Sequence, residues 1–241
     1  MGSISHIHGN IFDSSMQTIV NTVNCVGFMG GGIALEYKRR YPDMYKEYKE
    51  YCLNGTLKMG ELHIWKEEEP WILNFPTKIH FKDPSKEEFI EKGLNKFVSN
   101  YRKHAIESIA FPQLGTQLGG LDWENTVKPI MYKYLDTLDV QVEIYEFDKN
   151  ADDLLFINLR NILQKFSNDD FKTYLDIGKK TSENIMQNLD IRITSMRDME
   201  YVPGVGEKAL EKIYSLAKQD IDKFGNTDEI QFEQDQLKFN E

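Results

Sequence analysis

Apolar runs of strand length alternate with amphipathic stretches over residues 1–148. Short apolar runs predict buried strands, and apolar positions that recur every three to four residues predict helices. The predicted strands cover residues 4–12 (with a turn at Gly9-Asn10), 18–20, 61–66, 71–75, 107–111 and 140–147. The predicted helices cover residues 33–40, 43–52, 86–101 and 122–138, with the tyrosines of 43–52 as packing residues and Ser85 and Glu88 as a capping box. This alternation predicts an α/β domain.

Two glycine-rich loops each follow an apolar strand and precede a helix. Residues 21–34 contain four glycines within six positions, and residues 114–121 contain three. Glycine lets the backbone turn tightly and lets a ligand touch it, while a helix N-terminus offers unpaired N–H groups to an anion. Neither loop has the Walker or the dinucleotide spacing. One such loop is equally compatible with a plain turn, but two could close on a diphosphate from both sides.

Three motifs follow one another along the same part of the chain. They read Asn21-x-x-Asn24-Cys25-x-Gly27-x-Met29-Gly30-x-Gly32-Ile33-Ala34, then Asn74-Phe75-Pro76-Thr77-Lys78-x-His80, then Pro112-x-Leu114-Gly115-x-x-x-Gly119-Gly120-Leu121-Asp122-Trp123. In this order they resemble the macrodomains, and within them the branch that includes the antitoxin DarG and the terminal ADP-ribose protein glycohydrolases. The resemblance implies a three-layer α/β/α fold with a mixed central sheet, and ADP-ribose as the ligand.

The resemblance also implies which residues contact ADP-ribose. Asn10 and Ile11 would hold the adenine, although a turn asparagine before a core isoleucine explains them nearly as well. Phe147 would stack on the adenine or pack in the core. The full expected set is Asn10, Ile11, Asn21, Cys25, Gly27, Met29, Gly30, Gly31, Gly32, Ile33, Thr77, Leu114, Gly115, Thr116, Gln117, Leu118, Gly119, Gly120, Leu121 and Phe147.

Lys78 is the leading candidate for a catalytic group. It follows an apolar strand beside the expected cleft, where a lysine can act as a base or a nucleophile, although most lysines are simply surface residues. In the glycohydrolases that the sequence resembles, the matching lysine is essential to cleavage. We expect Asn24 to hold the distal ribose hydroxyls. His80 either assists the reaction or caps the loop. Cys25 has no base nearby in the sequence, which disfavours it as a nucleophile.

One departure from part of the family concerns acidic residues. Some macrodomain hydrolases carry an acid in one of the two loops, but the first loop here has none. In the second, Asp122 stands at a helix start, where an N-cap role explains it better. Hydrolysis should therefore depend on Lys78 and Asn24. That pattern resembles the DarG side of the family, which removes ADP-ribose from thymidine in DNA.

Past a polar break at residues 148–153 the pattern becomes helical. Residues 201–213 read helix, apolar-Pro-Gly-apolar-Gly, helix, which resembles the helix-hairpin-helix motif. A weaker copy at 174–185 matches it after a shift of 28 residues, which predicts a tandem arrangement. The first copy has Asp176 in place of Gly204, so a purely structural role is open for it. We predict a macrodomain at 1–148, a small all-α domain at 152–221 and an acidic, disordered tail at 222–241.

The helical domain could bind DNA phosphates through the amides of its second hairpin and nearby lysines. The expected residues are Gly204, Gly206, Lys208 and Lys212. Against this, residues 151–241 contain 12 Lys and Arg but 18 Asp and Glu, a balance of −6. A packing or protein-binding module is the alternative.

Composition and charge bear on the binding partners and on the cellular compartment. The net charge of −10 argues against nucleic-acid binding by charge alone. Two cysteines without paired spacing suggest a reducing compartment and no metal cluster. No stretch has the length of a membrane span, and no signal peptide precedes Ile4. We expect a cytoplasmic monomer with no cofactor, no metal and no membrane partner.

Three functions compete. The first is an ADP-ribosyl glycohydrolase that removes ADP-ribose from thymidine in DNA. The second is removal of ADP-ribose from aspartate or glutamate esters in proteins. The third is a non-catalytic ADP-ribose reader, or an antitoxin that sequesters a cognate ADP-ribosyltransferase toxin.

Overall fold

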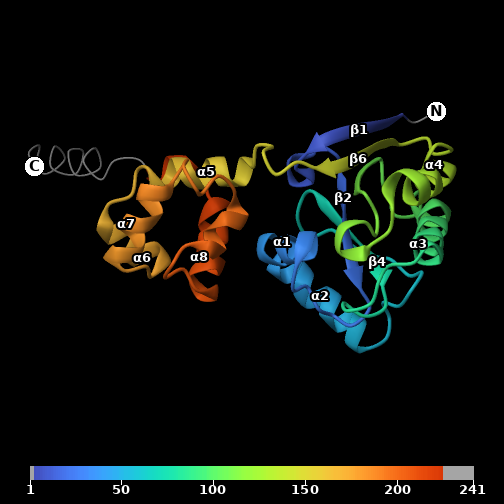
Figure 1. The fold of residues 1–241 in the computed structure, drawn as a ribbon, viewed down its shortest axis with the longest axis horizontal. Helices are drawn as coiled ribbons and strands as arrows, with labels where there is room; N and C mark the ends of the chain where they lie inside the picture. Colours follow the sequence, from blue (N-terminus) through green and yellow to red (C-terminus); the bar gives the residue numbers. More distant parts are fainter. Residues whose placement is uncertain (1–2, 225–241) are drawn as a thin grey trace, which may run out of the picture. The chain divides into compact units, whose positions relative to one another are not determined.

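The computed structural model describes residues 3–224 of the 241-residue chain (Figure 1). Contacts along the chain divide it into two compact units, Met1–Ala151 and Asp152–Glu241. Of the predicted acidic tail, residues 225–241 lie outside the described residues. Within 3–224, no helix combines the length and the apolar character that a membrane crossing needs.

A six-stranded mixed sheet forms the centre of the first unit. Its strands lie in the order β1 (Ile4–Gly9), β6 (Gln141–Phe147), β5 (Ser108–Pro112), β2 (Thr18–Asn24), β4 (Trp71–Lys78) and β3 (His63–Trp65). All neighbours pair in parallel except β3, which runs antiparallel at the edge. Every residue of β2 except Thr22 is buried, as a parallel strand covered on both faces requires.

Helices cover both faces of this sheet. Helices α1 (Gly32–Arg40) and α2 (Pro42–Leu53) lie on one side, and α3 (Glu87–Asn100) and α4 (Lys128–Leu135) on the other (Figure 1). Ile19 packs in the core that includes Met44 of α2, while the next residue, Val20, packs in the core that includes Phe97 of α3. Alternate strand residues thus feed two cores. The predicted α/β fold with a mixed sheet is confirmed.

One local prediction was wrong. The capping box before α3 does not form, because Lys86 is the N-cap and makes no side-chain cap bond. The hydroxyl of Ser85 is buried and has no hydrogen-bond partner among the described residues. The Ser85 N–H donates instead to Gly119 O at 2.9 Å, and this bond holds the residue against the second loop. The first strand ends at Gly9, where the turn was predicted, and residues 11–12 belong to a 3-10 turn, Ile11–Asp13, rather than to the strand.

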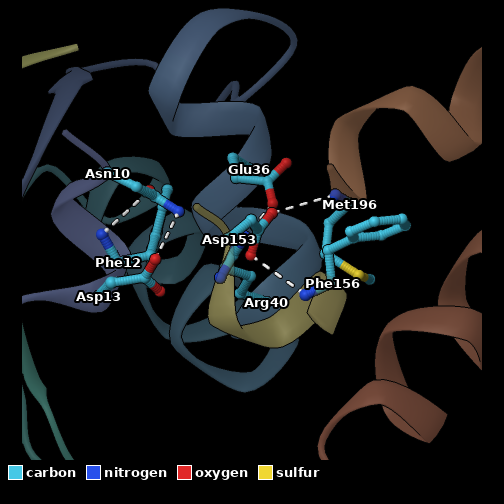
Figure 2. A network of polar contacts seen from close by, with 8 residues as sticks. All are labelled: Asn10, Phe12, Asp13, Glu36, Arg40, Asp153, Phe156 and Met196. Carbon is cyan, nitrogen blue, oxygen red and sulfur yellow. Dashed lines mark hydrogen bonds and ion pairs between the residues drawn. The ribbon is translucent and has the colours of Figure 1, made fainter. Parts of the chain in front are cut away.

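The second unit is built from helices in its described part. These are α5 (Leu154–Leu163), α6 (Asn168–Leu175), α7 (Lys179–Asn188), α8 (Glu207–Ala217) and two 3-10 turns, Met196–Tyr201 and Ile221–Phe224. They share one apolar core of their own. Asp153 caps α5 by accepting from Phe156 N at 3.3 Å, and it also accepts from Met196 N at 3.0 Å (Figure 2). One buried carboxylate therefore joins the start of α5 to the 3-10 turn at Met196–Tyr201.

The two hairpins of this unit repeat one backbone conformation. Asp176 has φ +56° and Gly204 has φ +92°, each two residues before the glycine that caps the next helix. Aspartate is among the few residues besides glycine that enter the left-handed region readily. The 28-residue repeat in the sequence therefore coincides with a repeat of the turn that separates α6 from α7 and the 3-10 turn Met196–Tyr201 from α8.

Gly204→Ala should destabilise the second unit. The left-handed backbone costs an alanine about 1–2 kcal/mol, and its Cβ would stand 2.3 Å from Thr181 Oγ1. Gly206→Ala is the comparison variant, because Gly206 has φ −96° and open space around its Cβ position. Alanine is a poorer N-cap than glycine, so this change should cost about 0.5–1 kcal/mol, without the clash that Gly204→Ala adds.

Denaturant unfolding followed by two probes tests this difference. All three tryptophans lie in the first unit, so their fluorescence follows that unit, while far-UV circular dichroism includes the helices of the second. Two units need not unfold in one step. Equal unfolding curves for the two variants would contradict the strain at Gly204.

Candidate functional site

The carboxyl ends of the five parallel strands lie along one edge of the sheet, where open α/β sheets bind ligands. Gly9 pairs with Phe147 at the β1–β6 end, and Asn24 pairs with Lys78 at the β2–β4 end. From β1 to β4 the order crosses four strand spacings, about 19 Å. The expected adenine residues and the expected catalytic residues therefore stand at opposite ends of an extended site, with the second loop, after β5, between them.

The first loop connects β2 to α1. Its backbone enters the left-handed region at Gly27 (φ +76°) and Gly32 (φ +58°). Gly30 lies beneath the ring of Phe28, where a Cβ would come within 2.2 Å of a ring carbon. Helix α1 begins at Gly32, so its first N–H groups have no partner within the helix and attract an anion.

Asn24 holds the shape of this loop from below. Its side-chain oxygen accepts from Val26 N (3.0 Å), Phe28 N (3.4 Å) and Tyr48 Oη (3.2 Å), and its amide nitrogen donates to Phe28 O (2.5 Å). Tyr48 also donates to Asn24 O at 2.8 Å. Asn24 is 6% exposed. Its contact with the distal ribose stays a prediction. Of the two amide hydrogens of Asn24, one is donated to Phe28 O and the other is available for such a contact.

The second loop uses glycine and one strained residue. Gly115 (φ +68°), Gly120 (φ +81°) and Gln117 (φ +46°) all enter the left-handed region. A Cβ at Gly119 would lie 2.6 Å from Ser85 Oγ. Since Ser85 N also donates to Gly119 O, the segment before α3 supports this loop. No local pattern in the sequence indicates that support, because it joins residues 34 positions apart.

The two loops meet at Leu118, beside Lys78. The Leu118 side chain lies 3.0 Å from the position that a Cβ on Gly32 would take and 3.8 Å from the one on Gly31. Its carbonyl oxygen accepts from Lys78 Nζ at 2.5 Å. The structure therefore places the Lys78 amine against the second loop and close to the first. A group that acts on a ligand held between the two loops needs this position.

His80 takes part in the loop that follows β4. Its Nδ1 accepts from Lys82 N at 3.3 Å, and its carbonyl oxygen accepts from Asp83 N at 3.0 Å. This is the loop-capping arrangement, and it leaves the proton of the neutral ring on Nε2. A role in the reaction stays a prediction.

The cysteines have the properties of packing groups. Burial, and secondarily the nearby Cys52, raise the pKa of Cys25 to about 11. The thiol is then protonated near neutral pH and is a poor nucleophile. Within residues 3–224, no three His, Cys, Asp or Glu side chains gather as metal ligands do.

Several residues expected at the ligand have buried side chains. Asn21 is 0% exposed because helices cover both faces of β2, and its amide donates to Asn74 Oδ1 at 2.8 Å. Ile11, Met29 and Leu114 also lie in the core. The side-chain contact expected of Asn21 is therefore not supported in this structure. Backbone atoms remain available at the loop positions.

At the opposite end, Asn10 makes local contacts. Its side-chain oxygen accepts from Phe12 N at 3.2 Å, and its nitrogen donates to Asp13 Oδ2 at 3.3 Å (Figure 2). This agrees with the alternative of a turn asparagine. Asp13 places a carboxylate at this end that sequence analysis did not identify. Phe147 is 50% exposed and is the last residue of β6.

Comparisons with known proteins agree with this geometry. The Macro domain family matches residues 20–130. A DNA ADP-ribosyl transferase–DNA ADP-ribosyl glycohydrolase fusion protein of Thermosipho africanus is 38% identical over 162 residues, 59% of this chain and 42% of its own length. The DNA ADP-ribosyl glycohydrolase of Mycobacterium tuberculosis is 38% identical over 146 residues, with the same shares. This chain thus spans less than half the length of these relatives.

Solved structures extend the likeness to the whole first unit. The macrodomain of Thermus aquaticus DarG superimposes with a TM-score of 0.58 and 37% identity, over 61% of this chain and 99% of that one. Thermosipho africanus DarTG in complex with ADP-ribose gives 0.58 and 37%, over 62% of this chain and 42% of that one. Through its first unit, with a mixed sheet and two glycine loops at one edge, this chain belongs to the macrodomain family.

Proposed function

We propose that this protein is a hydrolase that binds ADP-ribose and removes it from thymidine in DNA. The observation that carries the proposal is the position of the Lys78 amine, which lies where the two glycine loops meet. Lys78 also pairs with Asn24 in the register of β2 and β4. Relatives at 38% identity are named DNA ADP-ribosyl glycohydrolases, which favours DNA over protein esters as the substrate.

The ligand would extend along the carboxyl edge of the sheet. The diphosphate would lie between the loops, held by amides at the start of α1 and by the backbone of residues 115–120. The adenine would lie near Phe147 and Asn10, and the distal ribose near Asn24. This orientation places the anomeric carbon within reach of Lys78, the last residue of β4.

Lys78 would then act where the glycosidic bond breaks. The Lys78 amine attacks the anomeric carbon, or assists water there, and the electron pair of the broken bond leaves with the thymine nitrogen. That nitrogen takes up the proton that the attacking amine or water releases. Water completes the hydrolysis and releases free ADP-ribose. The loop amides stabilise the diphosphate throughout.

The second unit would bring the enzyme to DNA through a tandem helix-hairpin-helix arrangement. Its two matching left-handed turns support that reading. The negative charge of Asp176 limits the positive potential of this unit. Lys172, then Lys212 and Lys208, lower the pKa of the Asp176 carboxyl. Asp176 is therefore charged, and it shares the field of two lysines that we expect at the DNA. Phosphate binding would depend strongly on the hairpin amides.

The fusion relative suggests a partner as well. Its name combines a DNA ADP-ribosyl transferase with a glycohydrolase. We therefore propose that a cognate ADP-ribosyltransferase toxin, acting in the same cytoplasm, produces the substrate of this protein. An ADP-ribose reader or a sequestering antitoxin is the alternative without catalysis.

Lys78→Ala should abolish turnover and leave ADP-ribose binding nearly intact. Losing a group that acts at the reacting bond should lower the rate by about 100-fold or more. The measurement is release of ADP-ribose from a thymidine-modified single-stranded oligonucleotide, beside a glutamate-modified protein, with ADP-ribose affinity by calorimetry. Lys46→Ala is the control, because Lys46 is an exposed lysine of α2 that pairs with Asp43.

The outcomes separate the candidate functions. Turnover of the oligonucleotide that is lost in Lys78→Ala supports the proposal. Cleavage of the protein alone would move the activity to ester hydrolysis. Binding of ADP-ribose without release from either substrate would mean a reader.

Lys208→Ala combined with Lys212→Ala should raise the KM for a modified oligonucleotide several-fold and spare a modified mononucleotide. Each lost phosphate contact should also flatten the dependence of log KM on log salt by roughly one. Lys218→Ala, at the other end of α8, is the control. Unchanged salt dependence in the double variant would exclude these lysines from the DNA contact.

A further inference from the structure

Two loops beside Lys78 expose large apolar side chains that the proposed chemistry does not use. The exposed fractions of these side chains lie between 39% for Phe81 and 51% for Ile79. We call them the rim patch; its members are Val26, Phe28, Ile79 and Phe81. Contiguous exposed apolar side chains of this size mark binding surfaces more often than accidents of folding.

The rim patch is held in place by its surroundings. The rings of Phe28 and Phe81 lie 4.5 Å apart between centroids, at 43°, and Phe81 stacks on His80 at 4.2 Å and 29°. Gly30 leaves room for the Phe28 ring, and Asn24 binds both backbone polar groups of Phe28. The two rings therefore pack against each other, and the residues around them set where they stand.

The backbone joins the two segments of the rim patch. Cys25 N, in the first loop, donates to Ile79 O at 3.0 Å, immediately after β4. Phe81 consequently stands three residues past Lys78 in a segment tied to the first loop. The rim patch therefore includes the residue next to Lys78 in the chain, and Lys78 carries the amine that we place at the reacting bond.

A lysine beside the aromatic pair indicates which kind of ligand the rim patch binds. Lys82 Nζ lies 5.8 Å from the centre of the Phe81 ring. Aromatic faces beside a cation are the elements with which proteins hold unpaired nucleic-acid strands, the base on the ring and the phosphate on the cation. When ADP-ribose fills the loops, the group across the scissile bond must lie beyond Lys78.

We propose that the rim patch is the subsite for the leaving nucleobase: the unpaired pyrimidine that carries ADP-ribose stacks on the Phe28–Phe81 pair, and its phosphate lies near Lys82. This inference rests on the proposed function, because it assigns the substrate on the far side of the same bond. It explains how a site that holds ADP-ribose through its backbone also distinguishes a base from a protein side chain.

Phe81→Ala in the full chain should raise the KM for a thymidine-modified single-stranded oligonucleotide about tenfold, the loss expected for one base–aromatic stack. Affinity for free ADP-ribose should stay unchanged. Phe81→Trp should restore the KM, because an indole stacks at least as well as a phenyl ring. Its added fluorescence should also be quenched by the oligonucleotide. Leu53→Ala, at the exposed end of α2, is the matched apolar control and should behave as wild type.

The outcomes of this experiment are separable from failure of the proposed function. An unchanged KM in Phe81→Ala, with the wild type active on the oligonucleotide, overturns the subsite and leaves the proposed function standing. An equal loss of ADP-ribose affinity also overturns it, since Phe81 would then shape the ADP-ribose site. If the wild type cleaves only the glutamate-modified protein and Phe81→Ala weakens that reaction, the rim patch binds protein and both proposals fail.

Discussion

The buried side chain of Asn24 is the constraint on which the reactive end of the site depends. A polar group in the interior must be hydrogen-bonded, and this amide meets that need by binding the loop above it at Val26 and Phe28. Tyr48 fixes the amide from α2. One requirement of burial thus determines the path of the first loop, the position of the Phe28 ring and the space that Gly30 must leave.

The second loop completes the site through contacts that neither loop makes alone. Leu118 touches the first loop with its side chain and binds Lys78 with its carbonyl, while Ser85 supports Gly119 from the segment before α3. Gln117 has a strained backbone conformation at φ +46°, and the contacts of this network hold it there. Three connections of the sheet therefore set the position of one amine. Geometry of this kind suits a reaction in which a side chain must be held at the reacting bond.

The two units divide the proposed work in a physically sensible way. The first would hold a small ligand through backbone groups at a sheet edge, which would give affinity without a basic surface. The second repeats one turn twice, with aspartate and glycine at equivalent left-handed positions. In a chain of net charge −10, DNA contact has to be local and built from amides and a few lysines.

The sequence alone determined the α/β class, the strands and helices, the two glycine loops and the candidacy of Lys78, because apolar periodicity, glycine runs and motif order are local signals. It also indicated the 28-residue repeat. Only the tertiary structure decided what each candidate contacts: Asn21 and Asn24 look alike in the sequence and both are buried, yet Asn21 bonds to Asn74 within the sheet and Asn24 holds the first loop. The support of Gly119 by Ser85 and the pairing of Phe28 with Phe81 join residues far apart in the chain, and contacts of that kind arise from packing rather than from any local pattern.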